Sequence, residues 1–123
     1  MKFNIYETLL ADPFIKSKTA GRIKLYEYPA ASEVTGPCIV IDPIGPSLPG
    51  DYADNQWLSD EHSLQIEVWS KTLSDTESIS KRIREVMWDD LGFAQQASGV
   101  DEWDRDTGVY REARRYRGKT YVE

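Results

Sequence analysis

The sequence predicts an α+β fold in two layers, a mainly antiparallel sheet of about four strands with two helices packed on one face. Three observations support this prediction. Residues 63–69 alternate strictly between apolar and polar, residues 75–90 repeat their apolar side chains at helical intervals, and 123 residues suffice for one domain but not comfortably for two. Helices and strands that each have one apolar side bury those sides together in a shared core. We therefore expect a single domain over residues 1–123.

The strand at residues 63–69 is the clearest of the expected strands. Successive side chains of a strand point to opposite faces of its sheet. The two faces would carry Leu64, Ile66 and Val68 on one side, and Gln65, Glu67 and Trp69 on the other.

The helix expected at about residues 75–90 has signals at both ends. Ser74 and Glu77 have the spacing of a capping box, with Ser74 as the N-cap. Gly92 fits the position just beyond the last turn. The apolar stripe consists of Ile79, Ile83, Val86 and Met87.

The N-terminal third adds a helix and two strands. Ile5 and Leu9 are one helical turn apart, and Asp12-Pro13 should end or kink that helix. Residues 22–28 alternate like a half-buried strand. Residues 38–41 are apolar throughout, which predicts a central strand covered on both faces.

A long Pro/Gly-rich loop is expected at about residues 42–62. Three prolines and two glycines fall within eight residues, which disfavours regular structure. Its apolar side chains either fold back over the core or contact another chain. The candidates for an interface are Leu48, Tyr52, Trp57 and Leu58.

The C-terminal part combines an irregular connection at 93–99, a polar hairpin tip at 101–108 and a strand from about 109 to 116. Residues 111–119 carry a local charge of +4, whereas the whole chain carries −6, so the remainder carries −10. The basic segment either meets acidic groups of another copy or partner, or pairs with nearby acids in the same molecule. The candidate interface residues here are Asp101, Asp104, Asp106, Arg111, Arg114, Arg115 and Arg117.

No catalytic or cofactor-binding pattern emerges. His62 lies in a polar stretch and is expected to face solvent, and Cys38 is expected to be buried without a disulfide partner. The aspartates at 101–106 resemble part of a calcium loop, but Arg115 stands where the closing glutamate is needed. We expect no metal, no cofactor and no enzymatic activity. No apolar run approaches the ~18 residues of a membrane span.

Several segments in order resemble the tail-terminator (tail-completion) proteins of long, non-contractile-tailed phages and prophages. The resemblance spans nearly the whole chain, and none of its pieces is a catalytic signature. It is carried by residues 37–43, 53–54 and 64–69, by Met87, by residues 92–93, and by residues 104–108 and 113–118.

The resemblance implies a virion tail protein, made in the bacterial host cytoplasm, that assembles into a ring, in this family a hexamer. Such a ring would cap the tail tube protein and provide the surface that joins the head connector, while DNA passes through it. A head-completion or neck adaptor protein remains an alternative. Outside phage assembly, a small regulatory α+β domain that binds a ligand, or a small metal enzyme, would also suit the size and composition.

Overall fold

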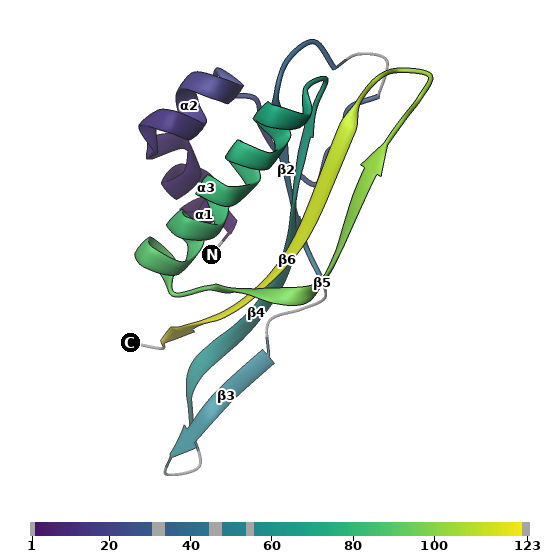
Figure 1. Ribbon diagram of the computed structural model, residues 1–123. Helices are drawn as coiled ribbons and strands as arrows, with labels where there is room; N and C mark the ends of the chain where they lie inside the picture. The colour runs from purple at the N-terminus through teal and green to yellow at the C-terminus, as the bar shows by residue number, and fades with distance from the viewer. Residues whose placement is uncertain (1, 31–33, 45–47, 54–55, 122–123) are drawn as a thin grey trace.

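A computed structural model describes residues 2–30, 34–44, 48–53 and 56–121, with the backbone alone at 2–3, 51–53, 57–58 and 121. The three helices cover one face of a twisted sheet (Figure 1). The helices are α1 (Lys2–Ala11), α2 (Pro13–Thr19) and α3 (Leu73–Leu91). The strands are β1 (Ile23–Leu25), β2 (Cys38–Pro43), β3 (Leu48–Ala53), β4 (Gln56–Ser70), β5 (Ala94–Trp103) and β6 (Tyr110–Tyr121).

The 15-residue strand β4 organises the six-stranded sheet. One edge of β4 pairs with β6, and the other edge pairs with β3 near its start and with β2 near its end. Strand β5 follows β6 at one side, and β1 follows β2 at the other. Because β1 runs parallel to β2 and the other pairs are antiparallel, the sheet is mixed.

The core lies between α3 and the sheet. Leu64, Ile66 and Val68 point from β4 toward the helices, as their alternation predicts. The stripe of α3 faces them, and Ile79, Ile83, Val86 and Met87 are all buried. Burying one such side chain contributes about 1.5–3 kcal/mol.

A sharp break separates α1 from α2 at Asp12 and Pro13. Pro13 occupies the first turn of α2, where its missing N–H is not needed, and the Asp12 carboxylate accepts a hydrogen bond from the Ile15 N–H at 3.1 Å. The Arg82 guanidinium donates two hydrogen bonds to Asp12, at 2.6 and 3.0 Å. Asp12 therefore caps α2 and ties it to α3.

The general α+β prediction is confirmed, and its details change. The structure has six strands in a mixed sheet and three helices, not about four strands and two helices. Strand β1 is only three residues long, because Tyr26 adopts a left-handed φ of 65° directly after it. Strand β2 is buried on both faces, as predicted, and Cys38 is buried with it.

The segment at 42–62 is not a long loop. It contains β3 and the first half of β4, which form a hairpin that extends beyond the body of the sheet (Figure 1). Pro49 is tolerated because β3 is an edge strand, which within the described residues pairs with β4 alone and needs no N–H donor on its other side.

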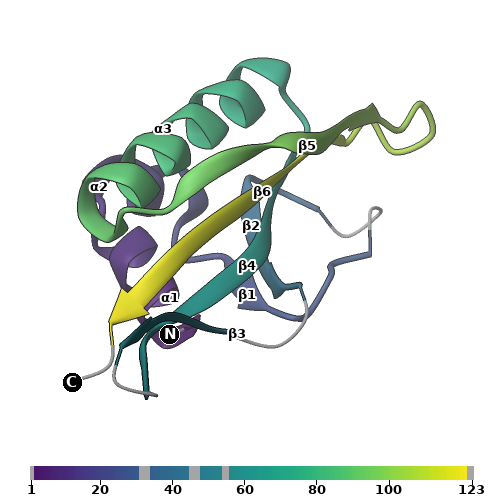
Figure 2. The same ribbon diagram turned by 90° about the horizontal axis from the view of Figure 1, so that it is seen from below.

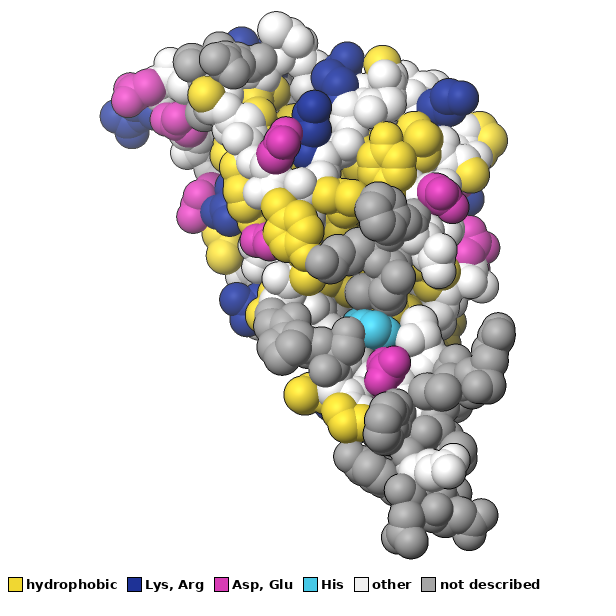
Figure 3. Space-filling model, turned by 180° about the vertical axis from the view of Figure 1, so that it is seen from behind, with side chains coloured by type: hydrophobic (Ala, Val, Ile, Leu, Met, Phe, Trp, Pro, Cys, Tyr) yellow, Lys and Arg dark blue, Asp and Glu magenta, His cyan; other side chains and the backbone are white. Residues whose placement is uncertain are grey.

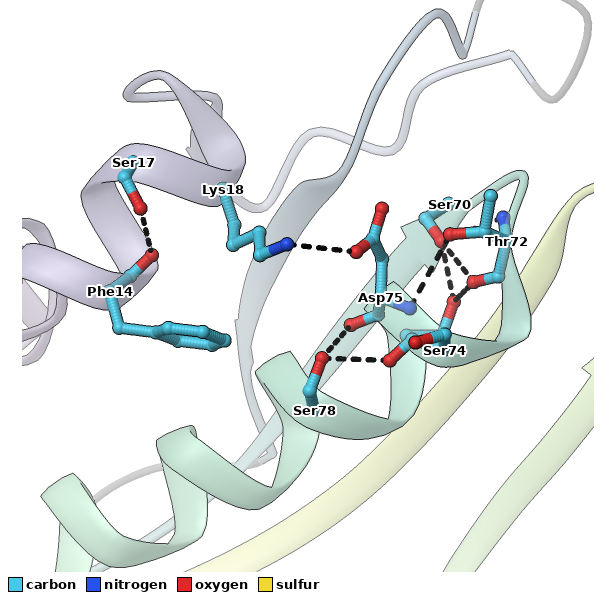
Figure 4. Close-up of polar contacts among 9 residues, drawn as sticks. Phe14, Ser17, Lys18, Ser70, Thr72, Ser74, Asp75 and Ser78 are labelled. Carbon is cyan, nitrogen blue, oxygen red and sulfur yellow. Dashed lines mark hydrogen bonds and ion pairs between the residues drawn. The ribbon is translucent and has the colours of Figure 1, made fainter.

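Two local predictions about polar residues were wrong. His62 is buried within β4, where its Nε2 lies 2.7 Å from Thr120 Oγ1 and its ring stacks on Phe93. The N-cap of α3 is Thr72 and not Ser74, since the Thr72 hydroxyl accepts from the Asp75 N–H at 3.4 Å (Figure 4). Gly92, in contrast, has the predicted left-handed conformation beyond α3.

The segment at 93–99 belongs mostly to strand β5 and is not an irregular connection. A register shift between Gln95 and Gly99 interrupts its pairing with β6. The Phe93 ring lies so close to Gly118 that a Cβ at this position would overlap it. Glycine at 118 therefore lets Phe93 close the end of the core.

Candidate functional site

The candidate interface residues lie on two hairpins whose tips are at opposite ends of the molecule, although Arg115 and Arg117 lie nearer the middle of the sheet, beside Gln65 and Ser63 of β4. The β3–β4 hairpin projects at one end, and the β5–β6 hairpin projects at the other (Figures 1 and 2). The first carries Leu48, Tyr52, Trp57 and Leu58, and the second carries the acidic and basic candidates of the C-terminal part. The sequence analysis assigned the first group to a long loop, whereas the structure places it on strands β3 and β4.

On the β3–β4 hairpin, Leu48 begins the edge strand and is 56% exposed. The backbones of Tyr52 and Trp57 are paired across the hairpin. The side chains of Tyr52, Trp57 and Leu58 lie outside the described part of the structure.

The acidic candidates divide between a strand and a turn. Asp101 belongs to β5, whereas Asp104 and Asp106 belong to the connection to β6. The Asp104 carboxylate accepts hydrogen bonds from the Asp106 N–H at 3.1 Å and from the Thr107 hydroxyl at 2.9 Å. These bonds, with Gly108 at a φ of 73°, fold the tip into a compact turn.

The arginines of β6 make their polar contacts within the same chain. Arg114 forms ion pairs with Asp101 at 2.7 Å and with Glu112 at 3.3 Å, and Arg117 pairs with Glu61 at 2.9 Å. Arg115 donates to the Gln65 side chain at 3.3 Å. This is the intramolecular pairing that the sequence left open beside contacts between copies. The guanidinium groups of Arg115 and Arg117 still face solvent.

Arg111 has a different role, because it neutralises a buried carboxylate. Its guanidinium contacts Glu67, which is 0% exposed, and also reaches Glu102 at 3.1 Å. Gln65 and Trp69 donate to the same Glu67 carboxylate at 2.7 and 3.1 Å. Burial opposes ionisation of Glu67, but these hydrogen bonds outweigh it and hold the pKa of the carboxyl below its usual value.

The side chain of Tyr28 lies near the buried Glu67 carboxylate. Its hydroxyl donates to Asp42 at 2.5 Å, and its ring lies 6.3 Å from that of Trp69. Burial is the main cause of the raised pKa of the Tyr28 phenol, and the carboxylates of Asp42 and Glu67 raise it further. The phenol therefore remains protonated. The network holds the sheet face opposite the helices together.

Large exposed apolar side chains occur at positions that the sequence analysis did not single out. Trp88, Trp103 and Leu73 are 61%, 53% and 48% exposed. The rear face of the molecule likewise mixes hydrophobic side chains with scattered charges (Figure 3). Trp103 could have been found in the sequence, because it stands between acidic residues. A loop or strand edge rich in charge rarely needs a tryptophan for its own stability, so such a residue indicates a contact surface.

Within the residues that the structure describes, no group of three or more His, Cys, Asp or Glu side chains is arranged to hold a metal ion. None of the helices in this part of the chain is long and apolar enough to cross a membrane.

Comparison with known proteins gives a likeness in fold. No family model and no curated protein matches the sequence. Among solved structures, one chain of the virion of a native gene transfer agent particle is similar, with a TM-score of 0.69 and 13% sequence identity. The likeness covers 96% of this chain and 92% of that one, so both share nearly the complete fold.

Proposed function

We propose that this chain is a structural protein of a phage-like virion, and within that class a tail terminator. The observation that carries the proposal is the likeness in fold to a chain of a gene transfer agent virion over 96% of this chain. The ordered segments that resemble tail terminators point the same way. In this role the protein acts by binding other proteins and not by catalysis.

The shape of the monomer suits assembly into a ring. A ring requires two different patches on each copy, so that one patch docks on the other patch of the next copy. The two hairpins at opposite ends of the sheet offer such separate patches (Figures 1 and 2). We therefore infer that the ring, a hexamer in this family, forms through surfaces that include them.

The proposed contacts follow from the candidate residues. The β3–β4 hairpin would contribute the apolar contacts of Leu48, Tyr52, Trp57 and Leu58. The exposed guanidinium groups of Arg115 and Arg117 would fix the register between copies by charge. One end of the ring would bind the tail tube protein and the other the head connector, while DNA passes through the channel.

Light scattering across a concentration series, at low and moderate salt, is the first test. The chain has a mass of 14.1 kDa. A species of about six times that mass supports a ring, and addition of the protein to purified tail-tube protein should then stop tube growth. A protein that neither assembles nor affects tube growth would contradict the proposal.

Two other functions make different predictions. A head-completion or neck adaptor protein would form a ring but would leave tube growth unchanged. A regulatory domain that binds a ligand would form a stable dimer, and its melting temperature would rise with the ligand.

A further inference from the structure

A groove lies between the first turns of α3 and the β5–β6 hairpin, and we call it the α3–hairpin groove. Leu73 and Glu77 line it from α3, and Asp101, Trp103 and Tyr110 line it from the hairpin. Its volume is about 240 Å³, whereas sites for small molecules typically measure about 300–1,000 Å³. The groove therefore has room for one or two side chains of another protein.

The apolar part of the groove is open to water. Leu73 and Trp103 are about half exposed, and the Trp103 ring lies 6.1 Å from that of Tyr110. Exposed apolar side chains that border one hollow mark a surface for protein contacts. Tryptophan and tyrosine are also the residues most enriched where binding energy concentrates.

The charged part of the groove is acidic, but most of its carboxylates are already paired within the chain. Its lining includes four carboxylates, those of Glu77, Asp101, Glu102 and Glu112, and one guanidinium, that of Arg111. Arg111 pairs with Glu102 and with the buried Glu67, and Arg114 pairs with Asp101 and Glu112. Burial raises the pKa of Glu112, and the charges of Asp101 and Glu77 add to this, while Ser80 and Arg114 oppose it. Glu77, exposed on the first turns of α3, is the lining carboxylate that is available to a positively charged occupant.

Helix α2 presents the matching chemistry on another part of the surface. Phe14, Lys16 and Lys18 are all exposed on this short helix. The Lys18 ammonium lies 5.8 Å from the centre of the Phe14 ring, so an aromatic side chain and positive charge stand together (Figure 4). Within one chain, Asp12–Arg82 and Lys18–Asp75 contacts hold α2 against α3. Phe14 and Lys16 remain exposed beside these contacts and are available to another molecule.

We propose that the α3–hairpin groove of one copy receives helix α2 of a second copy. Phe14 would pack against Leu73 and Trp103, and Lys16 would lie beside Glu77. Such a contact joins two different patches, as a ring requires. The inference deepens the proposed function by naming a surface between copies, and it depends on that function only for its role in the virion.

Cross-linking of two variants, each with one introduced cysteine, tests the contact directly. One copy carries Lys16→Cys and the other Glu77→Cys, while the natural Cys38 stays buried. The inference predicts a disulfide between the two variants when they are mixed and oxidised, and little dimer from either alone. Absence of this mixed dimer at millimolar concentration would overturn it.

Association measured by light scattering provides the second arm. Trp103→Ala and Glu77→Lys should each weaken self-association by about tenfold or more, whereas Trp88→Ala is a matched control outside the groove. Glu77→Lys combined with Lys16→Glu should restore part of the loss. If Trp88→Ala weakened association as much as Trp103→Ala, or if the charge exchange restored nothing, the proposed contact would be wrong.

The tube assay separates this inference from the proposed function. If the wild-type protein stops tube growth and the Glu77→Lys variant does so equally well, the inference fails and the function stands. If the mixed disulfide forms but the wild-type protein leaves tube growth unchanged, the contact stands and the tail-terminator function fails.

Discussion

At the scale of single residues, the carboxylate of Glu67 is the most important charge for stability. The face of the sheet on which it lies could be predicted from the sequence, but its role could not. The alternation at 63–69 puts Glu67 on the sheet face opposite the helices, and the structure buries it completely there. A buried carboxylate remains ionised only when it is paired and hydrogen-bonded. Arg111, Gln65 and Trp69 together meet that requirement.

Replacement of Arg111 by alanine should therefore destabilise the protein strongly. The change leaves Glu67 buried without its cation, and breaking a buried ion pair in this way costs about 3 kcal/mol or more. Urea denaturation followed by circular dichroism measures the loss. Arg115→Ala is the matched control on the same strand, and it should change stability by less than about 0.5 kcal/mol, because Arg115 is exposed. Equal costs for both variants would contradict the role assigned to Arg111.

Asp12 makes the stability depend on pH. Hydrogen bonds from Arg82 lower the pKa of Asp12 despite the opposing effect of burial, and the Ile15 N–H contributes further. A lowered folded-state pKa gives stability that is fully present above the unfolded value of about 3.9 and is lost as the pH falls through the folded value.

The Asp12→Asn variant tests this contribution. Its amide oxygen still caps α2, but it carries no charge to titrate. We expect the variant to be less stable than the wild type at neutral pH, and the difference should shrink below about pH 4. Urea unfolding at a series of pH values measures it. A difference that stayed constant down to about pH 2.5 would show that the charge of Asp12 does not contribute to stability.

At the scale of elements, the sequence predicted those segments whose local pattern and tertiary setting agree. Helix α3 has one consistent periodicity and strand β2 contains an unbroken apolar run, and the expected segments at 75–90 and 38–41 lie within these two elements. The β3–β4 hairpin was missed because Pro49 and Gly50 disfavour a strand locally, while pairing with β4 on one edge makes one possible. Pairing with β6 likewise creates β5 from a segment without alternation. Such long-range partners leave no local pattern in the sequence.

The start of α3 shows the same limit on a smaller scale. Two hydroxyl residues, Thr72 and Ser74, stand two positions apart, and each is followed after three residues by an acid. In the structure Thr72 is the N-cap. Its hydroxyl accepts a hydrogen bond from the Asp75 N–H and lies beside Ser70 and Thr76, whose hydroxyls are hydrogen-bonded to each other (Figure 4).

Alanine at these two positions should have unequal effects. Thr72→Ala removes the N-cap and should cost about 1 kcal/mol. Ser74→Ala lies on the exposed first turn and should cost less than about 0.5 kcal/mol. Thermal unfolding of the two variants and the wild type compares them under one condition. A larger loss for Ser74→Ala would favour the capping box over the observed cap.

At the scale of the whole molecule, the charge distribution is more balanced than the sequence indicates. The +4 segment on a −10 remainder gave the expectation of a basic strand that seeks acids elsewhere. The fold places Glu61, Glu67, Asp101 and Glu102 beside that strand, so much of its charge is neutralised within the chain. The sequence identified the strand as a candidate site, but only the register of β4, β5 and β6 shows which arginines remain available to a partner.

Arg115 is the arginine best suited to test charge-based assembly. Reversal of Arg114 would also break its ion pairs with Asp101 and Glu112, and the loss would mix folding with assembly. Arg115 is exposed, and its described side-chain contact is a hydrogen bond to the neutral Gln65. Arg115→Glu should therefore leave the melting temperature nearly unchanged. If Arg115 meets an acidic surface of the next copy, the same change should lower the association constant by about tenfold and reduce its dependence on salt. Light scattering at two salt concentrations measures both quantities, and a variant with wild-type association at both would show that Arg115 does not contribute to the register between copies.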